Sequence, residues 1–201
     1  MRMRASGLVF GLSIAACSAS LAQEPADSPN LDWIDRALVA AGEIVLQTGK
    51  DDDAVTIDLA LRISAPKETI RAVLRACESA PEYTPNIVAC RRIDTVDNGQ
   101  SELFVQTVKP VFFVPRFEHV FRLDYFPRRV EVHRVSGPIA ELDGTWWFID
   151  EPDGTVLLVH SLRLRPGLPV PKFFVRSSLR RDLPKILGAV RMRSEALAGS
   201  L

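Results

Sequence analysis

The sequence predicts an α+β domain in which a curved antiparallel sheet wraps around a long C-terminal helix and encloses a cavity. Three observations support this fold class. Short stretches of alternating apolar and polar residues follow one another, separated by turn residues. A helical segment precedes most of them, and an amphipathic segment from about 172 to 198 ends the chain. Because consecutive antiparallel strands twist and curl, a helix on the concave face fills only part of the space.

The individual elements follow from periodicity and turn signals. The clearest strand is "AVTIDLALRIS", in which every odd position from Val55 to Ile63 is apolar. A helix is expected at 64–77, with Pro66 in its first turn, and a short one at 31–41. Pro184 is expected to kink the last helix. The predicted strands are 42–48, 54–64, 87–96, 101–108, 116–126, 129–135, 141–150 and 155–165.

The composition fits a single globular domain, which we place at residues 31–201. The chain of 201 residues is 47% hydrophobic and 25% charged, which excludes an intrinsically disordered protein. Its formal net charge is +0, so no overall positive field favours nucleic acid, and no nucleic-acid partner is expected.

The N-terminus predicts export from the cytoplasm. In "MRMRASGLVFGLSIAACSASLAQ", two arginines precede a short apolar run, and "SLA" is a small-x-small cleavage site. We therefore expect a signal peptide at 1–22, a linker at 23–30 and a periplasmic or secreted domain. The alternative is that "IAAC" is a lipobox, in which case the protein is anchored by a lipid on Cys17.

Export changes the interpretation of the remaining cysteines, Cys77 and Cys90. An oxidising compartment favours a disulfide between them, which would stabilise the fold by about 3 kcal/mol in the chain-entropy model. The alternative is two buried thiols. Their spacing matches neither a C-x-x-C redox motif nor a zinc cluster, and no metal site is expected.

Three stretches of the chain carry motifs in a characteristic order: "ISAPKETIRAVLRACESAPEYTPNIVACRRI", "VSGPIAELDGTWWFIDEPDGTVLLVHSLRLRPGLPVP" and "RRDLPKILGAVR". Their order and spacing resemble the helix-grip (START-like) superfamily, which includes START lipid-transfer domains, polyketide cyclase-like proteins and coenzyme Q-binding proteins. The similarity runs from about 43 to 196. The resemblance implies a cavity between the sheet and the last helix. It leaves the function open, because relatives include carriers, cyclases and hormone sensors.

An aromatic inner wall is predicted for that cavity. In "GTWWF", matching the family's Gly-x-Trp places Trp146 toward the cavity and Trp147 outward. Alternation on "FEHVFRLDY" places a second set of rings on the same side. Such a wall suits a flat or long apolar ligand, and the alternative is that the rings simply fill the core. The predicted ligand-binding residues are Phe117, His119, Phe121, Tyr125, Trp146 and Phe148.

His119 is the one inward-facing polar residue on its predicted strand that has catalytic potential. It is interpreted as a hydrogen-bonded core residue, a polar contact to a ligand, or a base. No Ser-His-Asp, Cys-His or paired-carboxylate arrangement is visible, so no catalytic residue and no cofactor are assigned.

The resemblance to helix-grip proteins implies that loops at the leading end of the last helix frame the mouth of the cavity, and two apolar, proline-containing segments are expected there. "KPVFFVPR" (109–116) lies between two strands, and "RPGLPVPKFFVR" (165–176) leads into the last helix. With their basic flanks they would contact an anionic membrane transiently. The alternative is that they pack on each other and close the cavity. The predicted gate residues are Val111, Phe112, Phe113, Val114, Leu168, Val170, Phe173 and Phe174.

These features predict an exported protein that binds or transfers an apolar small molecule, such as a lipid, isoprenoid or quinone. One alternative is a cyclase/aromatase- or hydrolase-type enzyme that uses His119 or Tyr125. Another is a periplasmic interaction module that contacts a partner through outward Trp147 and the basic face of the last helix. The sequence identifies no protein partner.

Overall fold

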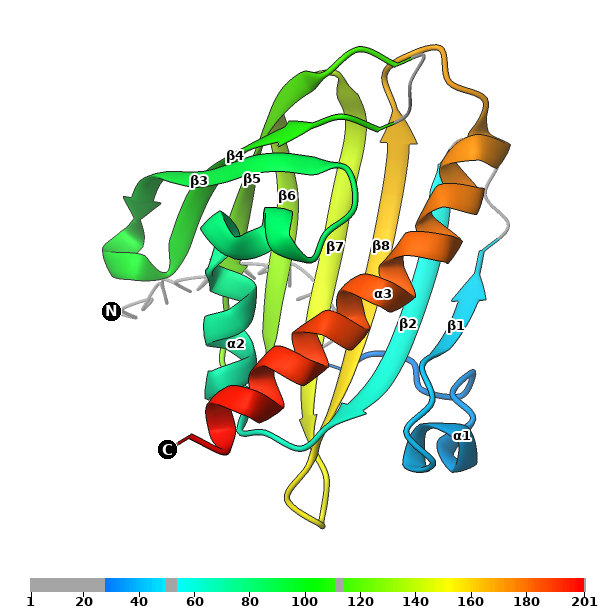
Figure 1. Ribbon diagram of the computed structural model, residues 1–201, viewed down its shortest axis with the longest axis vertical. Helices are drawn as coiled ribbons and strands as arrows, with labels where there is room; N and C mark the ends of the chain where they lie inside the picture. Colours follow the sequence, from blue (N-terminus) through cyan, green and yellow to red (C-terminus); the bar gives the residue numbers. More distant parts are fainter. Residues whose placement is uncertain (1–27, 50–53, 111–113, 201) are drawn as a thin grey trace, which may run out of the picture.

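A computed structural model describes residues 28–49, 54–110 and 114–200 (Figure 1). The predicted signal peptide and Cys17 lie outside the described residues. Within the described ranges, eight antiparallel strands form one sheet in the order β1-β2-β8-β7-β6-β5-β4-β3. The strands are β1 Val45–Thr48, β2 Val55–Ile63, β3 Ile87–Val96, β4 Ser101–Val108, β5 Phe117–Tyr125, β6 Arg129–Ser136, β7 Ile139–Asp150 and β8 Val156–Pro166.

The helices lie where the sequence predicts them, with one correction. The long helix α3, Lys172–Ala198, crosses one face of the sheet (Figure 1) and continues through Pro184. Helix α2, Lys67–Arg75, follows Pro66 and leads into the 3-10 turn η1, Cys77–Glu82. A second 3-10 turn, η2, is Asp97–Gly99. The predicted helix at 31–41 is shorter: α1 is Arg36–Ala40, because Asp35 accepts hydrogen bonds from two backbone N–H groups and caps the helix there.

The main core fills the space between the concave face of the sheet and the two longer helices. The odd residues of β2 from Ile57 to Ile63 are all buried in it, as the alternation predicts. Helix α3 contributes Leu183, Leu187 and Val190. Burial of this apolar surface is what fixes the helix on the sheet.

A second, smaller core lies on the opposite face of the sheet. Trp147 packs there with Leu157 and Val159, under Ile34 and Val39 of the N-terminal segment. Trp147 therefore points outward, as predicted, but it is only 9% exposed. The role of Trp147 as a partner contact, which was part of the alternative of an interaction module, is wrong, since residues around α1 cover the ring.

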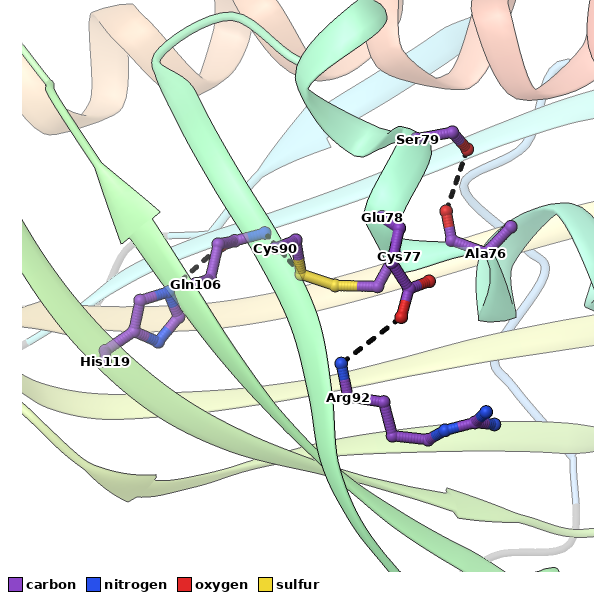
Figure 2. Close-up of a disulfide and its surroundings, with 8 residues drawn as sticks. All are labelled: Ala76, Cys77, Glu78, Ser79, Cys90, Arg92, Gln106 and His119. Atoms are coloured by element: carbon purple, nitrogen blue, oxygen red, sulfur yellow. Dashed lines mark hydrogen bonds between the residues drawn. A yellow bond between two sulfur atoms is a disulfide. The ribbon is translucent and has the colours of Figure 1, made fainter.

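The predicted disulfide is present. Cys77, at the start of η1, is bonded to Cys90 on β3, with 5.4 Å between their Cα atoms (Figure 2). Both cysteines are buried in the main core. The bond thus ties the end of the α2–η1 segment to β3, the edge strand of the sheet. No helix in the described ranges is both long enough and apolar enough to cross a membrane.

Candidate functional site

A cavity of about 320 Å³ lies between the sheet and the N-terminal half of α3. Its volume is at the lower end of the range for small-molecule sites, roughly 300–1,000 Å³. Strands β3, β4, β5, β7 and β8 contribute to one wall and α3 to the other. The apolar side chains that α3 contributes are Phe174, Val175, Leu179, Leu183 and Ile186.

Most polar groups in the described lining are already engaged. Ser178 donates a hydrogen bond to Asp182 (3.0 Å), and the guanidinium of Arg181 donates two more (both 2.9 Å). The bonds from Arg181 lower the pKa of Asp182, so its carboxyl group is ionised at neutral pH. Asn86 satisfies its amide nitrogen when this nitrogen donates to the backbone carbonyls of Lys109 (3.3 Å) and Pro110 (2.9 Å).

His119 is the exception. Its ring is 4% exposed and lines the cavity. Nε2 lies 3.0 Å from Oε1 of Gln106, whereas buried Nδ1 has no hydrogen-bond partner among the described residues (Figure 2). Burial lowers the pKa of His119 to about 4, so the imidazole is neutral at pH 7. A buried polar atom without a hydrogen-bond partner is rare and needs an explanation.

The structure brings two of the six predicted ligand-binding residues into the cavity. Phe117 and His119 line it. The other four belong to or pack against the main core: Phe121, Tyr125, Trp146 and Phe148. The reason is position along the strands, since residues 119 and 125 on β5 are about 20 Å apart at 3.3 Å per residue. The aromatic face extends beyond the cavity into a region that side chains fill.

Each of these four rings has a defined neighbour. Phe121 stacks on Phe104, with ring centroids 5.5 Å apart, and Trp146 stacks on His160 at 3.7 Å. The guanidinium of Arg71 lies 4.9 Å from the centre of the Phe148 ring. The hydroxyl of Tyr125 donates to Glu102 (2.8 Å). Packing of this kind is what the core-filling interpretation expects.

Four of the eight predicted gate residues line the cavity. They are Val114, Leu168, Val170 and Phe174. Phe173 is outside the lining and 65% exposed, with its ring centroid 4.0 Å from that of Phe174. The other three, Val111, Phe112 and Phe113, lie outside the described residues.

Sequence reasoning missed two polar residues on the inner face of β4. Gln106 contacts His119, and Glu102 is fully buried against Arg75, Arg92 and Tyr125. The pattern that could have revealed them is the alternation along 101–108, which places Glu102, Phe104, Gln106 and Val108 on one face of the strand. In the described part of the chain, no three His, Cys, Asp or Glu side chains are grouped so that they could hold a metal ion.

The curved sheet, the long helix across it and the cavity between them define a START-like helix-grip protein. The chain belongs to the polyketide cyclase / dehydrase and lipid transport family, whose model matches residues 63–191. A comparison with curated proteins finds no match.

Solved structures show the same fold at low sequence identity. A STAR-related lipid transfer protein from Xanthomonas axonopodis has a TM-score of 0.66 and 16% identity, over 74% of this chain and 92% of that one. Human STARD10 has a TM-score of 0.65 and 12% identity, over 75% and 69%. The Zhui aromatase/cyclase from Streptomyces sp. R1128 has a TM-score of 0.53 and 11% identity, over 78% and 94%.

Proposed function

We propose that this protein binds an apolar small molecule, such as a lipid, isoprenoid or quinone, and transfers it. The observation that carries the proposal is the apolar cavity of about 320 Å³ between α3 and the sheet. Transfer of an apolar molecule from water into such a site is favourable because it removes apolar surface from water. The family description, which includes lipid transport, supports the same conclusion.

We propose further that the protein acts outside the cytoplasm and contacts a membrane transiently. Export is supported by the N-terminal sequence pattern and by the disulfide, which persists in oxidising compartments. Membrane contact is supported by Phe173 and Phe174, exposed at the start of α3 and next to Lys172. Near an anionic bilayer a basic residue contributes about 1 kcal/mol.

The direct test is to purify the exported protein, extract it with organic solvent and identify lipids by mass spectrometry. Displacement of a fluorescent fatty alcohol then measures affinity. The variant Leu179→Trp, which fills part of the cavity from α3, should reduce binding at least tenfold and keep the fold by circular dichroism. Met192→Trp, on an exposed site of the same helix, is the matched control. Absence of any extractable or exchangeable apolar ligand contradicts the proposal.

A second candidate function is an enzyme that uses the same cavity. The observation in its favour is the buried Nδ1 of His119, which has no hydrogen-bond partner among the described residues. An unprotonated imidazole nitrogen of this kind can accept a proton from a substrate. The description of the family also includes polyketide cyclases. The variant His119→Phe separates the two functions: loss of turnover on a polyketide-like substrate with binding retained supports the enzyme, whereas a wild-type protein without turnover supports the carrier.

A further inference from the structure

A row of three side chains connects the disulfide to the cavity. Cys90, Gln106 and His119 are directly opposite one another on β3, β4 and β5. The amide nitrogen of Gln106 lies 3.9 Å from the Cys90 sulfur, and its amide oxygen lies 3.0 Å from Nε2 of His119 (Figure 2). The disulfide and the cavity wall therefore share one hydrogen-bonded side chain.

The disulfide determines which way the Gln106 amide faces. A disulfide sulfur has no hydrogen, so it can only accept, and the NH₂ group of Gln106 is the end that pairs with it. The reverse orientation would place the amide oxygen against the sulfur, where it has no donor. Since Oε1 consequently faces His119 and can only accept, the ring hydrogen of His119 is on Nε2.

The position of that hydrogen decides what the cavity offers to a ligand. A neutral imidazole carries one N–H group, so Nδ1 of His119 is an acceptor with a free lone pair. It is unpartnered among the described residues and less than 1 Å² of it is exposed, so a ligand that enters the cavity reaches it only when the side chains beside the ring move apart. The residue itself lines the cavity. A group that donates a hydrogen bond can satisfy Nδ1, whereas a carbonyl or ether oxygen cannot.

The other polar side chains of the described lining give no competing donor. The hydroxyl of Ser178 donates to Asp182, and the NH₂ group of Asn86 donates to two backbone carbonyls. The amide oxygen of Asn86 and the carboxylate of Asp182 are acceptors. The polar side chains of this part of the lining are therefore acceptors or are already donating.

We propose that the natural ligand presents an O–H or N–H group to Nδ1 of His119, and that the Cys77–Cys90 disulfide sets this preference through Gln106. The ligand class is an apolar alcohol, phenol or quinol, in preference to the corresponding ketone, ether or quinone. This inference rests on the proposed function, because it requires a ligand in the cavity.

A matched pair of ligands tests the preference. The probes are 2-dodecanol and 2-dodecanone, which have nearly the same shape and differ in the donor. Displacement titrations of the oxidised protein should give an alcohol affinity at least tenfold higher than the ketone affinity, because the ketone leaves Nδ1 unpaired. In His119→Phe the ratio should fall to about one while both compounds still bind.

The failures of the two proposals are distinguishable. Equal affinity for the two compounds, or tighter binding of the ketone, overturns this inference and leaves the proposed function intact. Binding of neither compound, together with absence of any other apolar ligand, overturns both.

A measurement without ligand tests the role of the disulfide. Two-dimensional ¹⁵N NMR of His119 in the oxidised protein should show the Nε2–H tautomer, and the Nδ1–H tautomer overturns the inference. Gln106→Leu should lower the alcohol-to-ketone ratio at least threefold, whereas Gln47→Leu, a glutamine of β1 paired with Asp58, should not. Reduction of the disulfide creates thiols that donate to the Gln106 oxygen, so it should also lower the ratio, and an unchanged ratio overturns the role of the disulfide.

Discussion

Arg75 binds Glu102 through both carboxylate oxygens, with Nε–Oε2 at 2.8 Å and Nη2–Oε1 at 2.6 Å. Glu102 is fully buried on β4, and Arg92 and Tyr125 donate to it as well. Burial alone would raise the pKa of Glu102. The hydrogen bonds from Arg75, Tyr125 and Arg92 outweigh burial and lower this pKa to about 2.

This network predicts an acid-sensitive contribution to stability. Because the pKa of Glu102 is lower in the folded state, its contribution is complete above the ordinary value of 4.5 and is lost as the pH falls toward 2. Glu102→Gln should therefore lower the free energy of unfolding by about 2 kcal/mol at pH 7. In urea titrations the difference from wild type should shrink between pH 4.5 and 2. Glu118→Gln, on the exposed side of β5, is the control, and a pH-independent difference contradicts the assignment.

The two buried histidines predict a second pH window. Burial lowers the pKa of both His119 and His160 to about 4, and the Thr145 carbonyl offsets this only in part for His160. Between pH 6.5 and 4 the unfolded chain binds more protons, so the free energy of unfolding falls as the pH falls. Each histidine contributes on the order of 3 kcal/mol to this fall. His160→Phe keeps a ring against Trp146 and should reduce the slope by about half, whereas an unchanged slope would show that His160 does not contribute.

The small core around Trp147 predicts a stability effect at a residue that the sequence places on the outer face. Trp147→Ala should lower the free energy of unfolding by about 3–5 kcal/mol, because it opens a cavity under α1. Met192→Ala, at a site that is 66% exposed, should change it by less than about 0.5 kcal/mol. Denaturant titrations of both variants are the measurement. An unchanged free energy of unfolding in Trp147→Ala would contradict the contribution of this ring to the small core.

The turn at Gly137 predicts a steric effect on the site. Gly137 has φ +109°, and a Cβ there would lie 2.7 Å from both Cα and Cβ of His119. Gly154 has φ +81° but nothing within 4 Å of its added Cβ. Gly154→Ala should therefore cost about 1 kcal/mol from backbone strain alone, and Gly137→Ala about 3 kcal/mol. The Gly137 variant should also shift the NMR signals of His119. An equal loss in the free energy of unfolding for the two variants would show that the turn shifts enough to avoid the clash with His119.

The order and bounds of most elements could be predicted because their signals are local. Alternation and turn residues placed seven of the eight strands and α3 within about two residues of their observed ends, since side-chain periodicity follows directly from backbone geometry. The first strand is three residues shorter than predicted. The start of the predicted helix at 31–41 was wrong, because Asp35 caps the shorter α1, which begins at Arg36.

The candidate site could be predicted only in part. Alternation identified Phe117 and His119 on the inner face of β5, but it contains no information about where along that face α3 stops filling the space. Phe121 and Tyr125 share the face and lie in the packed region. Gln106 and Glu102 were missed because an inward polar residue is recognisable only by its partners, which come from other strands and from α2.

Residue spacing and local chemistry were sufficient to predict the order of strands and helices and the inward face of each strong strand. The pairing of Cys77 with Cys90 was predicted from the expected export, with two buried thiols as the alternative. Only the packed structure shows that the cavity lies at one end of the sheet, that Trp147 is covered, and that Gln106 contacts both Cys90 and His119. These depend on how the elements cross and on which side chains meet across strands.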